Sequence, residues 1–245
     1  MKFSENPGVG MTIRDTMPIL LVPGLTCSPR IYAPVEGPLW RFGPVTVANH
    51  IRDDNMGAIA RRILAEAPPR FALAGHSMGG YVAFEIMRQA PDRVARLALI
   101  NTQARPDTAE VSERRRGFMA RAKAGKLHEV IDEHFPLMVH PARTGDAAIR
   151  KLAHDMADDV GAEGFLNNQT AIIARVDSRP VMATIRCPVL VLSGDQDLLI
   201  PNSLSREMAD GIPGAKLTIL SECGHCPQPE QPEATVAALT DWMQM

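Results

Sequence analysis

The stretch Ala72–Glu85, ALAGHSMGGYVAFE, places a serine between glycines at the point where the residue pattern changes. The residues before Gly75 form a short apolar run of strand length, and those from Tyr81 onward repeat their apolar positions at helical spacing. Gly75 and Gly79 flank Ser77 in a G-x-S-x-G pattern, and glycine permits both a sharp turn and the close approach of a helix. The pattern predicts a strand, a tight turn and a helix, with the Ser77 hydroxyl exposed at the tip. The alternative is an ordinary glycine-rich connection with an incidental serine.

The composition limits where the protein acts and what it binds. A chain of 245 residues is long enough for one sizeable α/β domain with a small insertion. The 26 lysines and arginines nearly balance the 28 acidic residues, so no overall charge attracts nucleic acid or anionic membranes. The apolar run Pro18–Pro23 is too short to span a bilayer, and residues 1–8 lack the apolar core of a signal peptide. We expect a cytoplasmic monomer or homodimer whose partner is a small molecule, with no nucleic acid and no membrane.

The 4 cysteines are expected to be reduced thiols, because nothing in the sequence indicates secretion. Cys223 and Cys226 form the sequence C-G-H-C, which could suggest redox chemistry or half a zinc site. However, no second C-x-x-C or H-x-x-x-H supplies the remaining ligands of a tetrahedral site. We therefore predict no metal and no other cofactor.

Short apolar runs alternate with amphipathic segments along most of the chain. The runs that we expect to be strands are 19–22, 44–49, 71–74, 97–100, 188–193 and 216–220. The segments that we expect to be helices between and after them include 56–66, 81–88, 203–210 and 233–245. Continuous apolar strands separated by helices are typical of a parallel sheet that is covered on both faces. The sequence predicts an α/β fold with a doubly wound, mostly parallel sheet.

The alternation stops between residues 105 and 180, where the pattern is helical and no strand is expected. A block of helices between two strands indicates an inserted helical cap. We therefore assign residues 1–104 and 181–245 to the core domain and residues 105–180 to the cap. The cap includes an arginine-rich segment, Glu113–Arg121, which would either dock an acidic partner or form a solvated helix face.

A serine hydroxyl needs a base to become a nucleophile, and histidine is the usual base. His225 has the most suitable position, because it lies in a proline-rich, non-helical loop after the last expected strand. His50 also follows a strand, whereas His76 adjoins the serine and would point elsewhere. The remaining histidines lie in the predicted cap: His128, His134, His140 and His154.

A carboxylate is needed to orient the histidine, and two aspartates follow the strand at 188–193. Asp195 and Asp197 both lie at the edge of the sheet where the serine and His225 are expected, and either would also suit a cap or turn. Serine, aspartate and histidine then occur in the chain order of an α/β-hydrolase.

The chain resembles the α/β-hydrolase superfamily, specifically serine esterases with a helical cap, from about residue 18 to its C-terminus. Four segments carry the resemblance: VPGLT at 22–26, GHSMGG at 75–80, GDQDLLIP at 194–201 and GH at 224–225 followed by PEQP. The resemblance implies that Ser77 is the nucleophile and His225 the base. The family pattern G-x-x-D-x-x-x-P implies that Asp197, rather than Asp195, is the orienting acid.

The resemblance also implies an oxyanion hole formed by the backbone N–H groups of Leu25 and Met78. Two departures from the family pattern occur: Pro23-Gly24 replaces the common His-Gly, and His50–Asn55 replaces a common Asp-Xaa-Arg-Gly-His-Gly. In addition, the N-terminal segment is too short for the family's full pair of leading strands.

The resulting prediction is a serine hydrolase that cleaves a carboxylic ester or thioester through an acyl-enzyme intermediate. Its substrate is expected to be small to medium in size and largely apolar. The residues expected to contact this substrate are Gly24, Thr26, His76, Phe135, Leu137 and Met138.

Three alternatives use the same fold. The first is a carbon–carbon bond hydrolase with the same triad, and the second is a non-catalytic ligand receptor. The third is an esterase for substrates on an acidic acyl-carrier protein, which Arg114 and Arg115 would dock.

Overall fold

The structure is a computed structural model that describes residues 16–245. Its centre is a parallel sheet in the order β2-β1-β3-β4-β5-β6. The strands are β1 (Ile19–Val22), β2 (Val45–Val47), β3 (Phe71–His76), β4 (Val94–Ile100), β5 (Val189–Gly194) and β6 (Lys216–Leu220). Each expected strand is therefore present, and the prediction of a doubly wound parallel sheet is confirmed.

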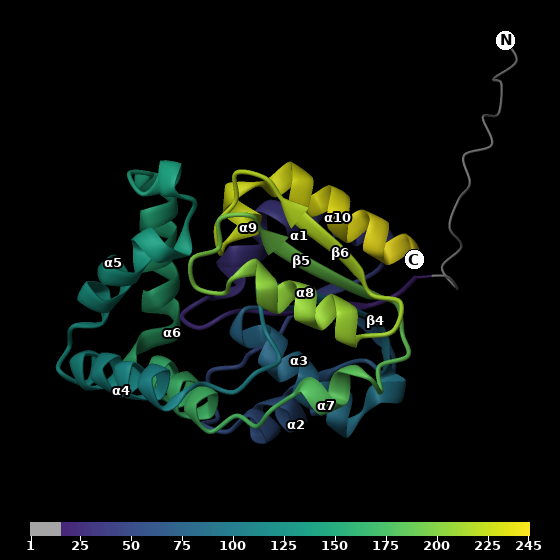
Figure 1. Cartoon of the computed structure of the whole chain (residues 1–245), viewed down its shortest axis with the longest axis horizontal. Helices are drawn as coiled ribbons and strands as arrows, with labels where there is room; N and C mark the ends of the chain where they lie inside the picture. Colours follow the sequence, from purple (N-terminus) through teal and green to yellow (C-terminus); the bar gives the residue numbers. More distant parts are fainter. Residues whose placement is uncertain (1–15) are drawn as a thin grey trace, which may run out of the picture.

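Helices cover both faces of the sheet (Figure 1). The core helices are α1 (Ala33–Leu39), α2 (Met56–Glu66), α3 (Met78–Gln89), α7 (Arg179–Met182), α8 (Asn202–Gly211), α9 (Pro227–Glu230) and α10 (Pro232–Gln244). Short 3₁₀ helices occur at Pro29–Tyr32 (η2), Trp40–Phe42 (η3), Pro91–Arg93 (η4) and Pro141–Arg143 (η5). Each face of the sheet has its own hydrophobic core. Helices α2, α3, α7 and α8 pack on one face, and helices α1 and α10 pack on the other.

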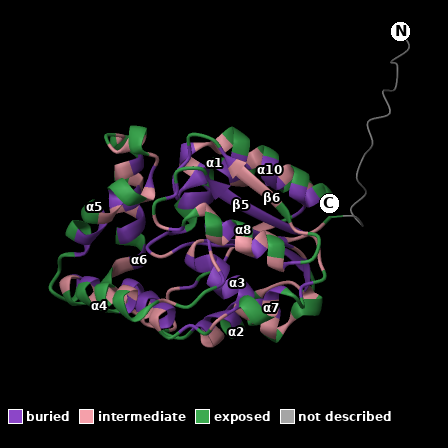
Figure 2. Ribbon diagram, in the orientation of Figure 1, coloured by how far each residue is buried: buried purple, intermediate pink, exposed green. Residues whose placement is uncertain are grey.

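The alternation of side chains along β1 explains these two layers. Leu20 and Val22 enter the core beneath α2 and α3, whereas Ile19 and Leu21 enter the core beneath α1 and α10. All four side chains are buried, and the same holds for most of the sheet (Figure 2). Burial on both faces is the reason that the strands read as continuous apolar runs in the sequence.

The order of the strands reverses at β1, which lies between β2 and β3. Val22 at the end of β1 is paired with Gly75 near the end of β3. The loops that follow these two strands therefore leave the sheet side by side. A reversal of this kind opens a crevice at the carboxyl ends of the strands, where α/β sheets bind ligands.

Helices α4 (Ala109–Lys123), α5 (Leu127–Met138) and α6 (Ala147–Ile173) form a separate layer beside the sheet domain (Figure 1). Their own hydrophobic core includes Phe118, Ile131 and Phe165. Helix α6 contains a break at Gly161, whose φ of 67° lies in the left-handed region that favours glycine.

One local expectation was wrong, because the proline-rich loop before the C-terminal helix contains the short helix α9. Pro227 is its first residue, a position that needs no N–H donor and that proline therefore tolerates. Helix α1 had not been predicted. The expectation about leading strands falls on residues 1–15, outside the described residues. In residues 16–245, none of the helices has the length and apolar character needed to cross a membrane.

Candidate active site

Ser77 occupies the sharp turn between β3 and α3. Its φ of 54° and ψ of −116° are unusual for a residue other than glycine, so the surrounding structure must hold this conformation. The flanking glycines make the turn possible. A Cβ on Gly75 would lie 2.3 Å from the carbonyl oxygen of Gly79, and one on Gly79 would lie 2.1 Å from that of Val22. The expected strand–turn–helix unit is present.

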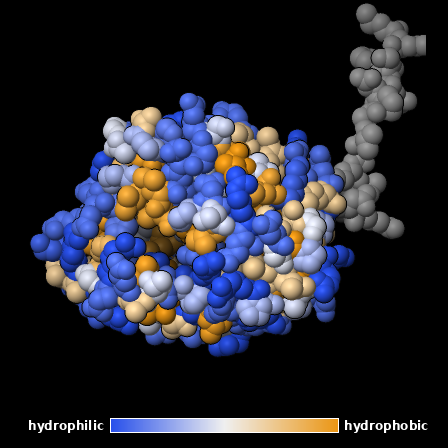
Figure 3. Space-filling model, in the orientation of Figure 1, coloured by the Kyte–Doolittle hydropathy of each residue, from blue (hydrophilic) through white to orange (hydrophobic). Residues whose placement is uncertain are grey.

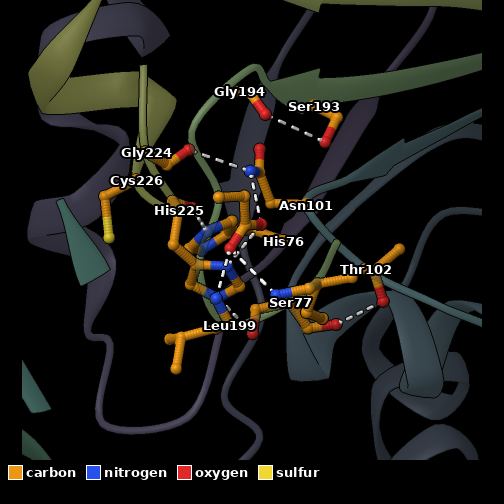
Figure 4. Close-up of polar contacts among 12 residues, drawn as sticks. His76, Ser77, Asn101, Thr102, Ser193, Gly194, Leu199, Gly224, His225 and Cys226 are labelled. Atoms are coloured by element: carbon orange, nitrogen blue, oxygen red, sulfur yellow. Dashed lines mark hydrogen bonds and ion pairs between the residues drawn. The ribbon is translucent and has the colours of Figure 1, made fainter. Parts of the chain in front are cut away.

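Ser77, His225 and Asp197 form a continuous chain of hydrogen bonds (Figure 4). The Ser77 Oγ lies 2.8 Å from Nε2 of His225, and Nδ1 of His225 lies 2.8 Å from Oδ2 of Asp197. In the tautomer that satisfies both contacts, Nδ1–H donates to the carboxylate and Nε2 accepts from the hydroxyl. This arrangement can remove the Ser77 proton and stabilise the resulting imidazolium.

The two aspartates after β5 have different surroundings. Oδ1 of Asp197 accepts hydrogen bonds of 2.9 Å from the backbone N–H groups of Leu199 and Ile200. Burial by itself would raise the pKa of Asp197, but the charge and hydrogen bond of His225 outweigh it, and the pKa lies below its usual value. Asp195 instead accepts a hydrogen bond of 3.1 Å from the backbone N–H of Cys223. The structure therefore brings Asp197, not Asp195, to His225.

Asn101 is a site residue that the sequence analysis missed. Its Nδ2 donates to Oδ2 of Asp197 at 2.8 Å and to the carbonyl oxygen of Gly224 at 3.1 Å. The residue is fully buried directly after β4, with a φ of 44°. Asn101 thus holds the carboxylate and the His225 loop together. Its place after a strand, at the edge that carries the other site residues, was the available signal.

The buried carboxylate of Glu230 fixes the loop that carries His225 through hydrogen bonds from the backbone. The Glu230 carboxylate accepts from the backbone N–H groups of His140 at 2.6 Å, Gly224 at 3.1 Å and Cys226 at 3.0 Å. Burial raises the pKa of Glu230, and these donors offset part of that effect. The backbone N–H of His225 also donates to the carbonyl oxygen of Met138 at 3.0 Å. Helix α5 is thereby joined directly to the loop.

His76 lies beneath His225 and is almost completely buried. Its Nε2–H donates to the carbonyl oxygen of His225 at 2.9 Å. Burial, together with the nearby His225, lowers the pKa of His76 to about 3. His76 therefore stays neutral and supports the backbone of His225, in agreement with the expectation that it does not face the serine as a base.

The loop after β1 contacts the serine turn closely. A Cβ on Gly24 would lie 3.1 Å from the Cβ of Ser77, so only glycine fits there without displacement. Within residues 16–245, the backbone N–H groups of Leu25 and Met78 have no hydrogen-bond acceptor. These two groups are free to stabilise an oxyanion beside Ser77. His50 fixes this loop, because its Nε2–H donates to the carbonyl oxygen of Gly24 at 3.0 Å.

A cavity of about 350 Å³ opens above Ser77, between the sheet domain and helices α4 to α6. Figure 3 shows an apolar recess on this face of the molecule. Several of the predicted substrate contacts line the cavity: Gly24, Thr26, His76 and Met138, together with Leu25 and Met78.

The predictions for two residues of α5 were wrong. Phe135 is buried within the core of the cap helices, and Leu137 is 40% exposed on its outer side. The face of α5 that lines the cavity instead carries Val130, Ile131, His134 and Met138. These four residues recur at helical spacing and form the face of α5 that meets the cavity.

Part of the arginine-rich segment is the solvated helix face that the sequence suggested, since Glu113, Arg114 and Arg116 are exposed, and the docking of an acidic partner stays a prediction. Arg114 and Arg115 both line the cavity. The Arg115 Nε donates to Oδ2 of Asp107 at 2.6 Å, and the Asp107 side chain is only 3% exposed. A charge reversal at Arg115 would therefore disturb an internal ion pair in addition to any surface contact.

The cysteines form no disulfide. Burial raises the pKa of Cys27 to about 12 and also raises the pKa values of Cys223 and Cys226, so these thiols remain protonated. No group of three or more potential metal ligands occurs in the part of the chain that the structure describes.

Comparisons with known proteins agree with this fold. A model of the alpha/beta hydrolase family matches residues 19–239. A putative carbamate hydrolase RutD from Klebsiella pneumoniae is 31% identical over 178 residues, which are 69% of this chain and 64% of that protein. The match thus spans just under two thirds of this relative's length. The pimeloyl-[acyl-carrier protein] methyl ester esterase of Aromatoleum aromaticum is 26% identical, with 78% of this chain and 80% of that protein covered.

Among solved structures, a thermophilic esterase from Thermogutta terrifontis with malate bound has a TM-score of 0.84 and 27% identity. The alignment covers 93% of this chain and 89% of that one. Because the family model spans nearly the entire described region, this chain belongs to the alpha/beta hydrolase family.

Proposed function

We propose that this enzyme is a serine esterase that forms an acyl-enzyme intermediate on Ser77. The observation that carries the proposal is the chain of two 2.8 Å hydrogen bonds from Ser77 through His225 to Asp197. A serine without a base is a poor nucleophile, and this arrangement supplies the base together with the group that orients it. The names of two relatives, a methyl ester esterase and a thermophilic esterase, support the same class of reaction.

In the proposed mechanism, Ser77 Oγ attacks the ester carbonyl while Nε2 of His225 accepts its proton. The backbone N–H groups of Leu25 and Met78 stabilise the oxyanion of the tetrahedral intermediate. His225 then protonates the departing alkoxide, which leaves the acyl group on Ser77. A water molecule, deprotonated by His225, attacks the acyl-enzyme and releases the acid.

The cavity supports a substrate of small to medium size. Its volume of about 350 Å³ is at the small end of ordinary ligand pockets. Apolar side chains such as Met78, Met138 and Phe165 line it beside the serine. These surfaces suit a short or medium acyl chain better than a long lipid.

The test is the hydrolysis of p-nitrophenyl esters of increasing acyl length, with Ser77→Ala purified in parallel. We expect turnover that depends on Ser77, with an optimum at short to medium chains. Ser77→Ala is expected to lower kcat by about five or six orders of magnitude. If folded Ser77→Ala retained more than about a tenth of the activity, Ser77 would not be the nucleophile.

A further inference from the structure

The polar part of the cavity carries more positive than negative charge. Arg105, Arg114 and Arg115 line the cavity, and Asp107 is the one acidic side chain among the described lining residues. Arg105 is already paired, because its Nη2 lies 2.7 Å from Oε1 of Glu207. The charges that matter therefore belong to Arg114 and to the group around Asp107.

Asp107 is shared between two arginines. Its carboxylate lies 2.6 Å from Nε of Arg115 and 2.8 Å from Nη2 of Arg175. The side chains of Asp107 and Arg175 are 3% and 4% exposed, so solvent screens this group weakly. Burial tends to raise the pKa of Asp107, but the two arginines outweigh that effect and keep the carboxyl charged. Two guanidinium groups against one carboxylate leave one positive charge uncompensated.

Hydrogen-bond donors without acceptors surround this charge. Gln169 is 1% exposed and accepts a hydrogen bond of 3.0 Å from Nη1 of Arg115 through Oε1, while its Nε2 donates no hydrogen bond within residues 16–245. Nη2 of Arg115 and the whole guanidinium of Arg114 likewise have no acceptor within these residues. A buried amide that leaves its donor facing a cavity is unusual, because such groups are normally paired.

The nearby imidazole does not change the charge of this group. His134 lines the same part of the cavity, and its Nδ1–H donates to the carbonyl oxygen of Val130 at 3.1 Å. Burial lowers its pKa, so the ring is neutral under ordinary conditions. The donors of Arg114, Arg115 and Gln169 are therefore available to an anion from outside the protein.

We propose that Arg114, Arg115 and Gln169 form a carboxylate subsite, so that the substrate carries a free carboxylate in addition to its ester. Guanidinium and amide donors match a planar carboxylate better than they match an apolar chain end. This inference rests on the proposed function, because it takes Ser77 as the group that attacks the ester.

The position of the subsite suits a short diacid. Tyr81 lies one turn of α3 beyond Ser77, and the Arg175 guanidinium is 4.2 Å from the centre of its ring. Asp107 bridges Arg175 and Arg115, so Arg115 is connected to the neighbourhood of Tyr81 through two ion pairs. A monoester of a dicarboxylic acid would place its ester at Ser77 and its carboxylate at Arg115 within the same cavity.

The experiment compares two esters of the same chain length, mono-p-nitrophenyl adipate and p-nitrophenyl hexanoate. We expect the wild-type kcat/KM to favour the adipate ester by about tenfold or more, as charged hydrogen bonds would give. Arg114→Gln and Gln169→Leu should each reduce this preference by up to about tenfold. Arg116→Gln is the matched control, because Arg116 is on the same helix, pairs with Glu113 at 2.9 Å and does not line the cavity.

The outcomes separate this inference from the proposed function. Ser77-dependent hydrolysis of the hexanoate ester without any preference for the adipate ester would overturn the proposed subsite but would support the proposed esterase activity. If neither ester were hydrolysed, the proposed function would fail, and calorimetry with adipate would then decide the subsite. Adipate binding that Arg114→Gln weakens by about tenfold supports the subsite, whereas no adipate binding, or binding of inorganic phosphate alone, overturns it.

Discussion

The amide of Asn101 donates a hydrogen bond of 2.8 Å to Oδ2 of Asp197, the same oxygen that accepts from His225. The carboxylate thus has donors on both oxygens, because Oδ1 accepts from the backbone after it. A carboxylate held in this way cannot rotate away from the imidazole. The position of His225 therefore depends on residues from three separate strand ends.

Asn101→Ala is expected to lower kcat by about tenfold and to leave KM nearly unchanged, because the change loosens Asp197 without touching the substrate cavity. The measurement is steady-state kinetics on the ester that the enzyme hydrolyses best. A larger increase in KM than decrease in kcat would contradict this role, since it would place Asn101 in substrate binding.

Asp197→Asn should reduce kcat by about 10⁴, because an amide at this position favours the wrong tautomer of His225. Asp195→Asn is the matched control. It retains an Oδ1 that can accept from the N–H of Cys223, so we expect a small effect. A greater loss in Asp195→Asn than in Asp197→Asn would mean that the wrong carboxylate has been assigned.

Glu230→Gln tests how the His225 loop is held. The NH2 group of the glutamine would face backbone N–H donors such as those of Gly224 and Cys226, so donors would meet donors. We therefore expect the free energy of unfolding to fall by about 1–3 kcal/mol and the activity to fall with it. Urea unfolding measures the first effect and ester hydrolysis the second. Glu233→Gln, at an exposed position at the start of α10, should change neither.

The buried histidines predict how stability changes with pH. Burial lowers the pKa of His50 from 6.5 to about 4, so the unfolded chain binds a proton in this range while the folded protein does not. Stability is then complete above pH 6.5 and is lost as the pH falls toward 4, by up to about 1.4 kcal/mol per pH unit. His76 acts in the same direction over a wider range.

The test of this linkage is urea unfolding at about pH 7, above the titration range of His50, and at about pH 5, inside that range. His50→Gln should lose less stability between these pH values than the wild type. An unchanged pH dependence in His50→Gln would show that His50 is not buried in its neutral form.

The sheet could be predicted from the sequence because its physical signals are local. Strands buried on both faces give continuous apolar runs, and Gly75 and Gly79 indicate the turn around Ser77 directly. The order of loops along a parallel sheet then brought Asp197 and His225 to the same edge. The prediction of a parallel sheet therefore already implied that these two residues lie close together.

The contents of the cavity could not be predicted in the same way. Which face of α5 meets the cavity depends on how the cap helices pack, and for that reason Phe135 and Leu137 were placed wrongly. Similarly, Arg115 and Asp107 are eight residues apart and pair across the start of α4, with Arg175 joining from beyond α6. Nothing in the local pattern distinguishes such arginines from those of a solvated helix.

The most direct measurement is the reaction of the protein with diisopropyl fluorophosphate, followed by mass spectrometry of the intact chain and its peptides. If Ser77 is the activated nucleophile, its Oγ displaces fluoride, and a single diisopropylphosphoryl group is found on the peptide containing Ser77 as ester hydrolysis is lost. A folded protein that stays unmodified at Ser77, or that keeps its activity once Ser77 is modified, would contradict the account.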